Sequence, residues 1–78
     1  MAAQTARTQM WHEPESGSTI YLRPAGGNSG YTVKLQTEAL PSQSDYLRET
    51  YCPDILFAAE RVMWLMENVV PGQWVKVS

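Results

Sequence analysis

Residues 53–70, PDILFAAERVMWLMENVV, give the strongest structural signal in the chain, because they hold a long helical pattern with clear ends. Pro53 suits the first turn of a helix, and Pro71-Gly72 terminates it. At 100° per residue the apolar side chains fall within one broad arc. That arc contains Ile55, Ala58, Ala59, Val62, Met63, Leu65, Met66, Val69 and Val70. The stretch predicts an amphipathic helix from about residue 53 to residue 68 whose apolar face covers a core.

Two alternating segments precede this helix and supply a surface for it to cover. Residues 18–23 place Ile20 and Leu22 on one side, and residues 31–38 do the same with Val33 and Leu35. Such alternation is typical of half-buried strands. The glycine-rich stretch between the two segments predicts a long hairpin loop.

The remaining segments complete an expected ββααβ order. Pro41 and the serines after it predict a short helix over residues 44–51, and residues 73–78 predict a last strand. Residues 1–17 lack a period and are expected to form a flexible arm before a single domain over residues 18–78. We therefore expect an α+β fold, a three-stranded antiparallel-type sheet covered on one face by two helices. The inward strand side chains would be Ile20, Leu22, Val33, Leu35, Val75 and Val77.

Length and composition exclude several classes of protein. With 78 residues and a net charge of −2, the chain has room for one small core and gives no global reason to bind nucleic acid or anionic membrane. Its single cysteine excludes an intramolecular disulfide, which favours the cytoplasm. The apolar runs are too short to span a bilayer, and the first ten residues do not resemble a signal peptide.

The reactive residue types do not form a catalytic pattern. His12 is the only histidine, and no spacing places it beside Cys52 or a serine. The loop Gly26-Gly27-Asn28-Ser29-Gly30 lacks the lysine and following helix of a phosphate-binding loop. We therefore expect no enzymatic activity, no cofactor and no metal site.

Two aromatic residues stand on the polar side of the long helix. Phe57 and Trp64 lie two turns apart, among Glu60, Arg61 and Glu67. In one interpretation the short helix or the N-terminal arm covers them. In the other they form an exposed anchor of the kind that dominates protein interfaces.

The outward face of the sheet has a different composition. Alternation assigns to it two aromatic and three basic residues, Tyr21, Arg23, Lys34, Trp74 and Lys76. Such a face is either an ordinary amphipathic sheet surface or a stacking platform for single-stranded nucleic acid.

Acidic residues gather around the short helix. Glu38, Asp45 and Glu49 are the main members of this group. They form either a solvated helix face or a surface that imitates nucleic acid phosphates and blocks a basic groove.

The ββααβ order resembles small phage-encoded anti-CRISPR proteins, specifically a type I-F inhibitor family. The matching features are the glycine-containing hairpin, the tyrosine-bearing short helix with Tyr46 and Tyr51, and the ending Gly72, Trp74, Val77 and Ser78. The resemblance implies binding to the CRISPR surveillance complex through acidic side chains, with Glu38, Asp45 and Glu49 as contacts. The net charge departs from the family, whose members are usually more acidic.

Together with these observations, the resemblance implies a non-enzymatic, stoichiometric inhibitor of CRISPR immunity that blocks target DNA recognition as a DNA mimic. Its partner would be a subunit of a type I effector, and its contacts Glu38, Asp45, Glu49, Phe57 and Trp64. The alternative function is a nucleic-acid-binding accessory module that uses the basic and aromatic sheet face. A third is an assembly protein with Phe57 and Trp64 as its subunit interface. The protein would be a monomer or a weak homodimer.

Overall fold

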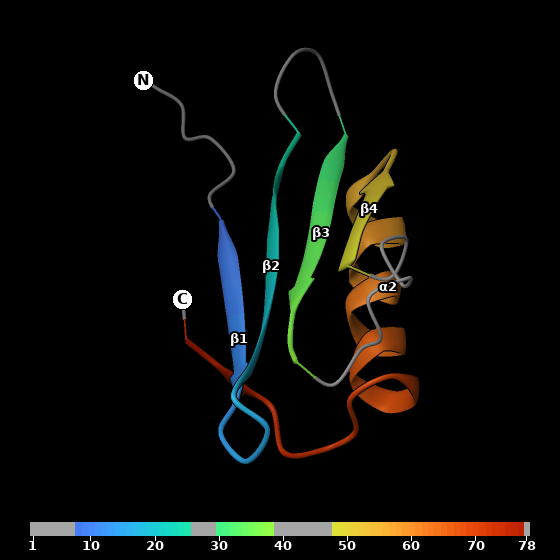
Figure 1. Ribbon diagram of the computed structural model, residues 1–78. Helices are drawn as coiled ribbons and strands as arrows, with labels where there is room; N and C mark the ends of the chain where they lie inside the picture. Colours follow the sequence, from blue (N-terminus) through green and yellow to red (C-terminus); the bar gives the residue numbers. More distant parts are fainter. Residues whose placement is uncertain (1–7, 26–29, 39–47, 78) are drawn as a thin grey trace.

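The computed structural model describes residues 8–25, 30–38 and 48–77. These residues form an antiparallel sheet of five strands and the helix α2 (Figure 1). The elements in chain order are β1 (Gln9–Glu13), β2 (Ser18–Pro24), β3 (Tyr31–Gln36), β4 (Glu49–Cys52), α2 (Ile55–Asn68) and β5 (Val75–Lys76). The α+β class and the antiparallel sheet are confirmed, whereas the expected number of three strands is wrong.

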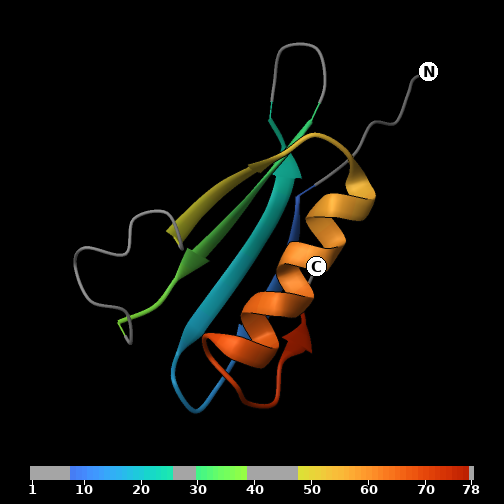
Figure 2. The same ribbon diagram turned by 90° about the vertical axis from the view of Figure 1, so that its right-hand side faces the viewer.

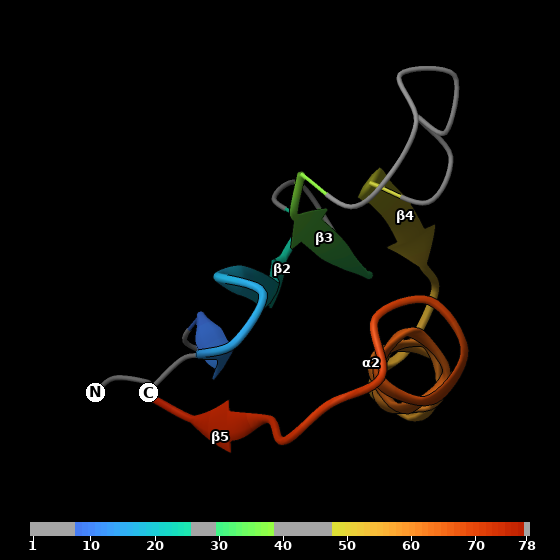
Figure 3. The same ribbon diagram turned by 60° about the horizontal axis from the view of Figure 1, so that its bottom comes forward.

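The strands lie in the order β4-β3-β2-β1-β5. The two strands that flank α2 in sequence are therefore at opposite edges of the sheet. The helix lies across one face of the sheet (Figure 2), and the chain after it returns to the far edge beside β1 (Figure 3). The helix packs on β2, β3 and β4, and β1 and β5 are outside its footprint.

The core lies between α2 and the inner face of the sheet. Its fully buried sheet residues alternate along β2 and β3, as the sequence predicts. Ala58, Val62 and Leu65 provide the buried face of the helix. The complete set of buried apolar residues is Ile20, Leu22, Val33, Leu35, Cys52, Ala58, Val62, Leu65 and Val70.

Local chemistry sets the ends of these elements. The Asp54 carboxylate accepts a hydrogen bond of 2.9 Å from the amide of Phe57 and so caps the first turn of α2. At the other end Pro71 prevents a further turn. Gly17, with a φ of 73°, closes the turn between β1 and β2, and its amide donates to the Glu13 carbonyl at 2.9 Å.

Strand β1 corrects the expectation of a flexible arm over residues 1–17. Its five residues pair with β2 from Gln9 opposite Leu22 to Glu13 opposite Ser18. The pairing with β2 on one side and β5 on the other satisfies the backbone of β1, so this segment belongs to the sheet. Residues 1–7 lie outside the described residues.

Strand β4 corrects the last part of the short helix expected over residues 44–51, because residues 49–51 belong to the strand, whereas Arg48 is helical. Residues 49–52 pair with β3 in an antiparallel register, with Glu49 opposite Lys34 and Cys52 opposite Tyr31. Pairing with the open edge of β3 gives residues 49–52 their backbone hydrogen-bond partners and ends the helical conformation after Arg48. Residues 44–47 lie outside the described residues.

The inward and outward sides of the last strand are the reverse of those expected. Val75 and Val77 are exposed, whereas Trp74 packs against the core. Alternation alone does not say which of two faces is buried, and a shift of one residue exchanges them. The expected core arc of the helix is also too wide, because Ile55, Ala59 and Met63 are exposed.

Candidate interaction surfaces

One flank of α2 presents the two aromatic residues to solvent. Phe57 is 56% exposed and Trp64 is 42% exposed, so no described element covers them fully. Between them lies Arg61, whose guanidinium carbon is 4.7 Å from the centre of the Trp64 ring. This cation–π contact orients the ring without removing it from solvent. We call Phe57, Arg61 and Trp64 the aromatic flank.

The aromatic flank is rigidly mounted. The capped first turn holds Phe57, and the Asn68 side chain donates a hydrogen bond of 3.1 Å to the Trp64 carbonyl. The buried residues Ala58 and Leu65 follow the two aromatics directly in sequence and fix the helix on the sheet. An aromatic surface that is already ordered loses little conformational entropy when a partner binds.

The open face of the sheet, opposite α2, collects three of the five residues expected there. Tyr21, Arg23 and Lys34 lie on it, since their registers alternate with the buried residues of β2 and β3. Tyr51 joins them from β4, because it pairs with Thr32, the partner of Arg23. The Tyr21 hydroxyl donates to Gln36 at 3.3 Å. The result is a small surface of two tyrosines and two cations.

Trp74 and Lys76, the other two expected members, lie elsewhere. The indole nitrogen of Trp74 donates to the Val70 carbonyl at 2.9 Å, which holds the ring against the core. The Lys76 ammonium lies 5.8 Å from the centre of the Trp11 ring, and Trp11 lies on the inner side of β1. The predicted basic face is therefore smaller than expected.

The acidic residues do not form the predicted helical surface within the described part of the chain. Glu38 follows β3 and is exposed, and Glu49 lies on β4 directly opposite Lys34 on the open face. Asp45 lies outside the described residues. The Glu49 carboxylate thus lies on a strand next to a lysine of opposite charge. This pairing weakens both the proposed acidic surface and the proposed basic surface.

The buried carboxylate of Glu13 was not anticipated. Its side chain is 2% exposed and accepts hydrogen bonds from the amide and hydroxyl of Ser16 at 2.7 and 2.6 Å. These bonds, with further ones from the amides of Glu15 and Gln73, lower the pKa of the Glu13 carboxyl. Because Gln73 follows α2 and Glu15 follows β1, the carboxylate ties together two loops at one end of the sheet.

Cys52 and His12, the other residues with reactive side chains, are held by contacts within the fold. Burial raises the pKa of the Cys52 thiol, which is fully enclosed at the end of β4. The Nδ1 atom of His12 is 3.3 Å from the Thr19 hydroxyl. Across residues 8–25, 30–38 and 48–77, no three histidine, cysteine, aspartate or glutamate side chains converge as metal ligands would. Over the same residues, no helix has the length and apolarity needed to cross a membrane.

Strands β1 and β4 are not predicted from the sequence, and neither is the position of Trp11 beside the core or of Tyr51 on the open face. The segment Pro14–Gly17 carried a usable signal, since proline and glycine in a four-residue turn before a strand are typical of a hairpin. Nothing comparable marks the start of β4.

Comparison of the chain with protein-family models, curated proteins and solved structures finds no match.

Proposed function

We propose that this protein acts by stoichiometric binding to a protein partner, without chemistry of its own, and that the aromatic flank of α2 is its contact surface. The observation that carries the proposal is the exposure of Phe57 and Trp64 on a helix fixed to the sheet. Tryptophan, arginine and aromatic side chains are enriched among the residues that dominate binding energy in interfaces. Here all three occur within two turns.

The partner that we propose is the effector complex of a type I CRISPR system. The proposal rests on the hairpin and on the ending Gly72, Trp74 and Val77, which resemble type I-F inhibitors, because the expected ββααβ order and the helical site of Tyr51 no longer support that resemblance. In this proposal the inhibitor occludes the surface that recognises target DNA. The site of Glu49 on a strand beside Lys34 favours the aromatic flank over an acidic helix as the principal contact. Glu38 and Glu49 then contribute at the rim, where charges affect association more than affinity.

The experiment follows labelled target DNA bound to a purified type I effector by fluorescence anisotropy while the protein is added. The proposal expects the anisotropy to fall to the free-DNA value near one equivalent. A variant carrying Phe57→Ala and Trp64→Ala should need at least about tenfold more protein, since each hot-spot residue contributes roughly 2 kcal/mol.

The matched control is Met63→Ala, which changes an exposed side chain of the same helix on its other flank. It should inhibit like the wild type. Unchanged inhibition by the folded double variant would contradict the aromatic flank. Loss of inhibition in Glu49→Lys alone would instead support an acidic contact. If the wild type leaves the DNA bound, the effector is not the partner.

The open face of the sheet favours a second candidate function, binding of single-stranded nucleic acid. Tyr21 and Tyr51 offer rings for stacking, and Arg23 and Lys34 offer cations for phosphates. This function predicts affinity for an oligonucleotide that falls steeply with salt and is lost in Lys34→Glu. Binding that is absent at low salt would exclude it.

A further inference from the structure

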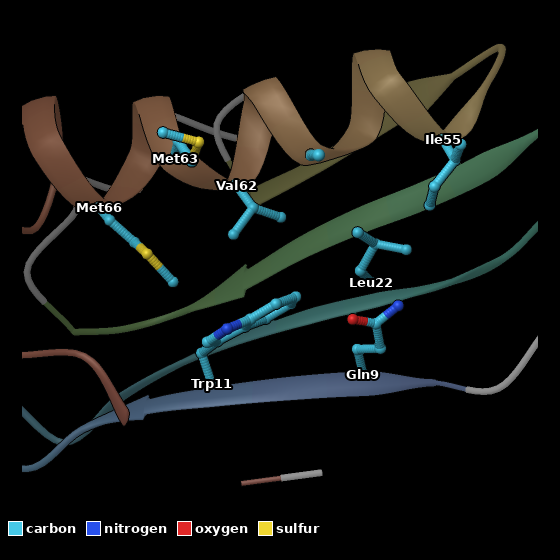
Figure 4. Close-up of a pocket in the computed structure, with 8 residues that line it drawn as sticks. Gln9, Trp11, Leu22, Ile55, Val62, Met63 and Met66 are labelled. Carbon is cyan, nitrogen blue, oxygen red and sulfur yellow. The ribbon is translucent and has the colours of Figure 1, made fainter. Parts of the chain in front are cut away.

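The other flank of α2 borders an apolar groove. The groove has a volume of about 270 Å³ and lies between the helix and strands β1 and β2 (Figure 4). Ile55, Ala59, Met63 and Met66 form its helical wall, and Trp11 and Leu22 lie on the strand side. Ile55 and Met63 are largely exposed, so the groove is open along its length. We call these six residues the groove flank.

The groove exists because one helix is too narrow for this sheet. Neighbouring strands lie about 4.8 Å apart, so the five strands span roughly 20 Å, whereas a helix with its side chains is about 10–12 Å wide. The helix α2 packs on the β4, β3 and β2 side of the sheet. The uncovered part over β1 and β5 is therefore about as wide as one more helix.

The charges at the rim indicate what kind of helix would fit. On the strand side the rim carries the Lys76 ammonium, which lies over Trp11. On the helix side it carries Glu60 and Glu67. Glu60 lies three residues before Met63 and Glu67 four residues after it, so both are neighbours of Met63 on the helix surface. One rim of the groove is thus basic and the other is acidic.

The same flank of α2 has the features that the groove requires of an occupant. It is apolar, its acidic residues lie beside the apolar stripe, and the small Ala59 at its centre permits close approach of another helix. A second copy could place its helix alongside α2, with its Glu60 near Lys76 and its Met63 near Trp11. Such a contact is self-complementary, as a two-fold interface requires.

We infer that two copies of this chain form a two-fold dimer in which the groove flank of each receives the α2 helix of the other. The contact leaves the aromatic flank of both copies available for a partner. This inference does not rest on the proposed function, because it uses the opposite side of the helix.

Sedimentation equilibrium of the full chain tests the inference. From roughly 1 µM to 1 mM the mean mass should rise from that of one chain toward that of two, as expected for a modest apolar interface. Met63→Glu should weaken the dimer at least about tenfold, because it places a carboxylate in the apolar contact. Met63 is exposed, so circular dichroism of this variant should match the wild type.

The neighbouring substitution Trp64→Glu is the matched control. It adds the same charge one residue further along, on the aromatic flank, and should leave the dimer intact. In the effector experiment Met63→Glu should inhibit like the wild type, whereas Trp64→Glu should inhibit less. A dimer that survives Met63→Glu, or that is lost only in Trp64→Glu, would overturn the inference and leave the proposed function to be judged by its own experiment.

The rim charges provide a second test. Lys76→Glu should weaken the dimer by repulsion from Glu60, and adding Glu60→Lys should recover most of the loss. A monomer at every concentration would overturn the inference. Binding of a fluorescent apolar probe to such a monomer, abolished by Met63→Glu, would instead identify the groove as a site for a small apolar ligand.

Discussion

The two halves of the inner sheet face are stabilised by different interactions. Over β2, β3 and β4 the helix buries Ala58, Val62 and Leu65 against an unbroken apolar surface. Over β1 and β5 the Trp11 and Trp74 rings are only partly buried, and individual polar contacts help to hold the chain. There Trp74 donates to Val70, the Val77 amide donates to the Met10 carbonyl at 2.7 Å, and Glu13 joins two loops.

The two halves therefore differ in what they contribute to stability and to recognition. Apolar burial is insensitive to pH and rises with contact area, so the half beneath α2 should determine the free energy of unfolding. Polar contacts order a segment without covering it, so the half over β1 and β5 stays open and contains the groove. The following substitutions test this division.

Leu65→Ala should have the largest effect. Leu65 is 1% exposed in the centre of the packed half, and its truncation removes apolar contacts and leaves a cavity. We expect a loss of about 2–5 kcal/mol in the free energy of unfolding, measured by urea denaturation. The control Met63→Ala changes a side chain that is 58% exposed and should cost less than about 1 kcal/mol. Equal losses would contradict the division between the halves.

Apart from β4, the packed half is the half that the sequence predicts well. The helix 55–68 and the hairpin of β2 and β3 follow from local patterns, because capping, periodicity and alternation all indicate the same structure. The prediction extends to Ile20, Leu22, Val33 and Leu35 as core residues.

In the open half the last strand is predicted, but its buried side and its pairing with β1 could not be predicted from local patterns. The strand Gln9–Glu13 reads QMWHE and does not alternate, and it ends in a buried carboxylate that accepts hydrogen bonds from nearby Ser16 and also from the distant Gln73 amide. Likewise, Lys76 and Trp11 become neighbours only when β5 pairs with β1. The groove depends on both strands and therefore could not be predicted from the sequence. Phe57 and Trp64 could be, because they are aromatic residues on a polar helix face.

Gly72→Ala should have the next largest effect. A Cβ atom at this position would lie 2.8 Å from the Glu13 carboxyl carbon, which is too close for a normal contact. Because hydrogen bonds hold that carboxylate in place, one of the two loops must move, at a cost of about 1–3 kcal/mol. Thermal unfolding of Gly72→Ala, Glu13→Ala and the double variant measures the coupling. Strictly additive losses would mean that the two residues do not meet.

Glu13→Gln should have a smaller effect on the melting temperature, while the overall fold is retained. The amide keeps one oxygen for Ser16 but turns an NH₂ group toward donors that the carboxylate accepted. Glu15→Gln, in the same turn but exposed, is the control and should melt like the wild type. An unchanged melting temperature for Glu13→Gln would show that the carboxylate does not hold the two loops.

The smallest effect should be a dependence of stability on pH that originates in the open half. Hydrogen bonds from Ser16 lower the pKa of the Glu13 carboxyl below its usual 4.5 in the folded protein. A carboxyl with a lowered pKa stabilises the fold fully above its unfolded pKa, and this contribution disappears as the pH falls through the folded pKa. The difference in stability between the wild type and Glu13→Gln should therefore stay constant above about pH 5 and shrink on further acidification.

Urea titrations of both proteins along a pH series measure this difference, and Leu65→Ala is the control. The loss of stability in Leu65→Ala should not change with pH, because it reflects lost apolar burial. A parallel decline of this loss and of the loss in Glu13→Gln would mean that acid acts on the whole fold instead of on the Glu13 carboxylate.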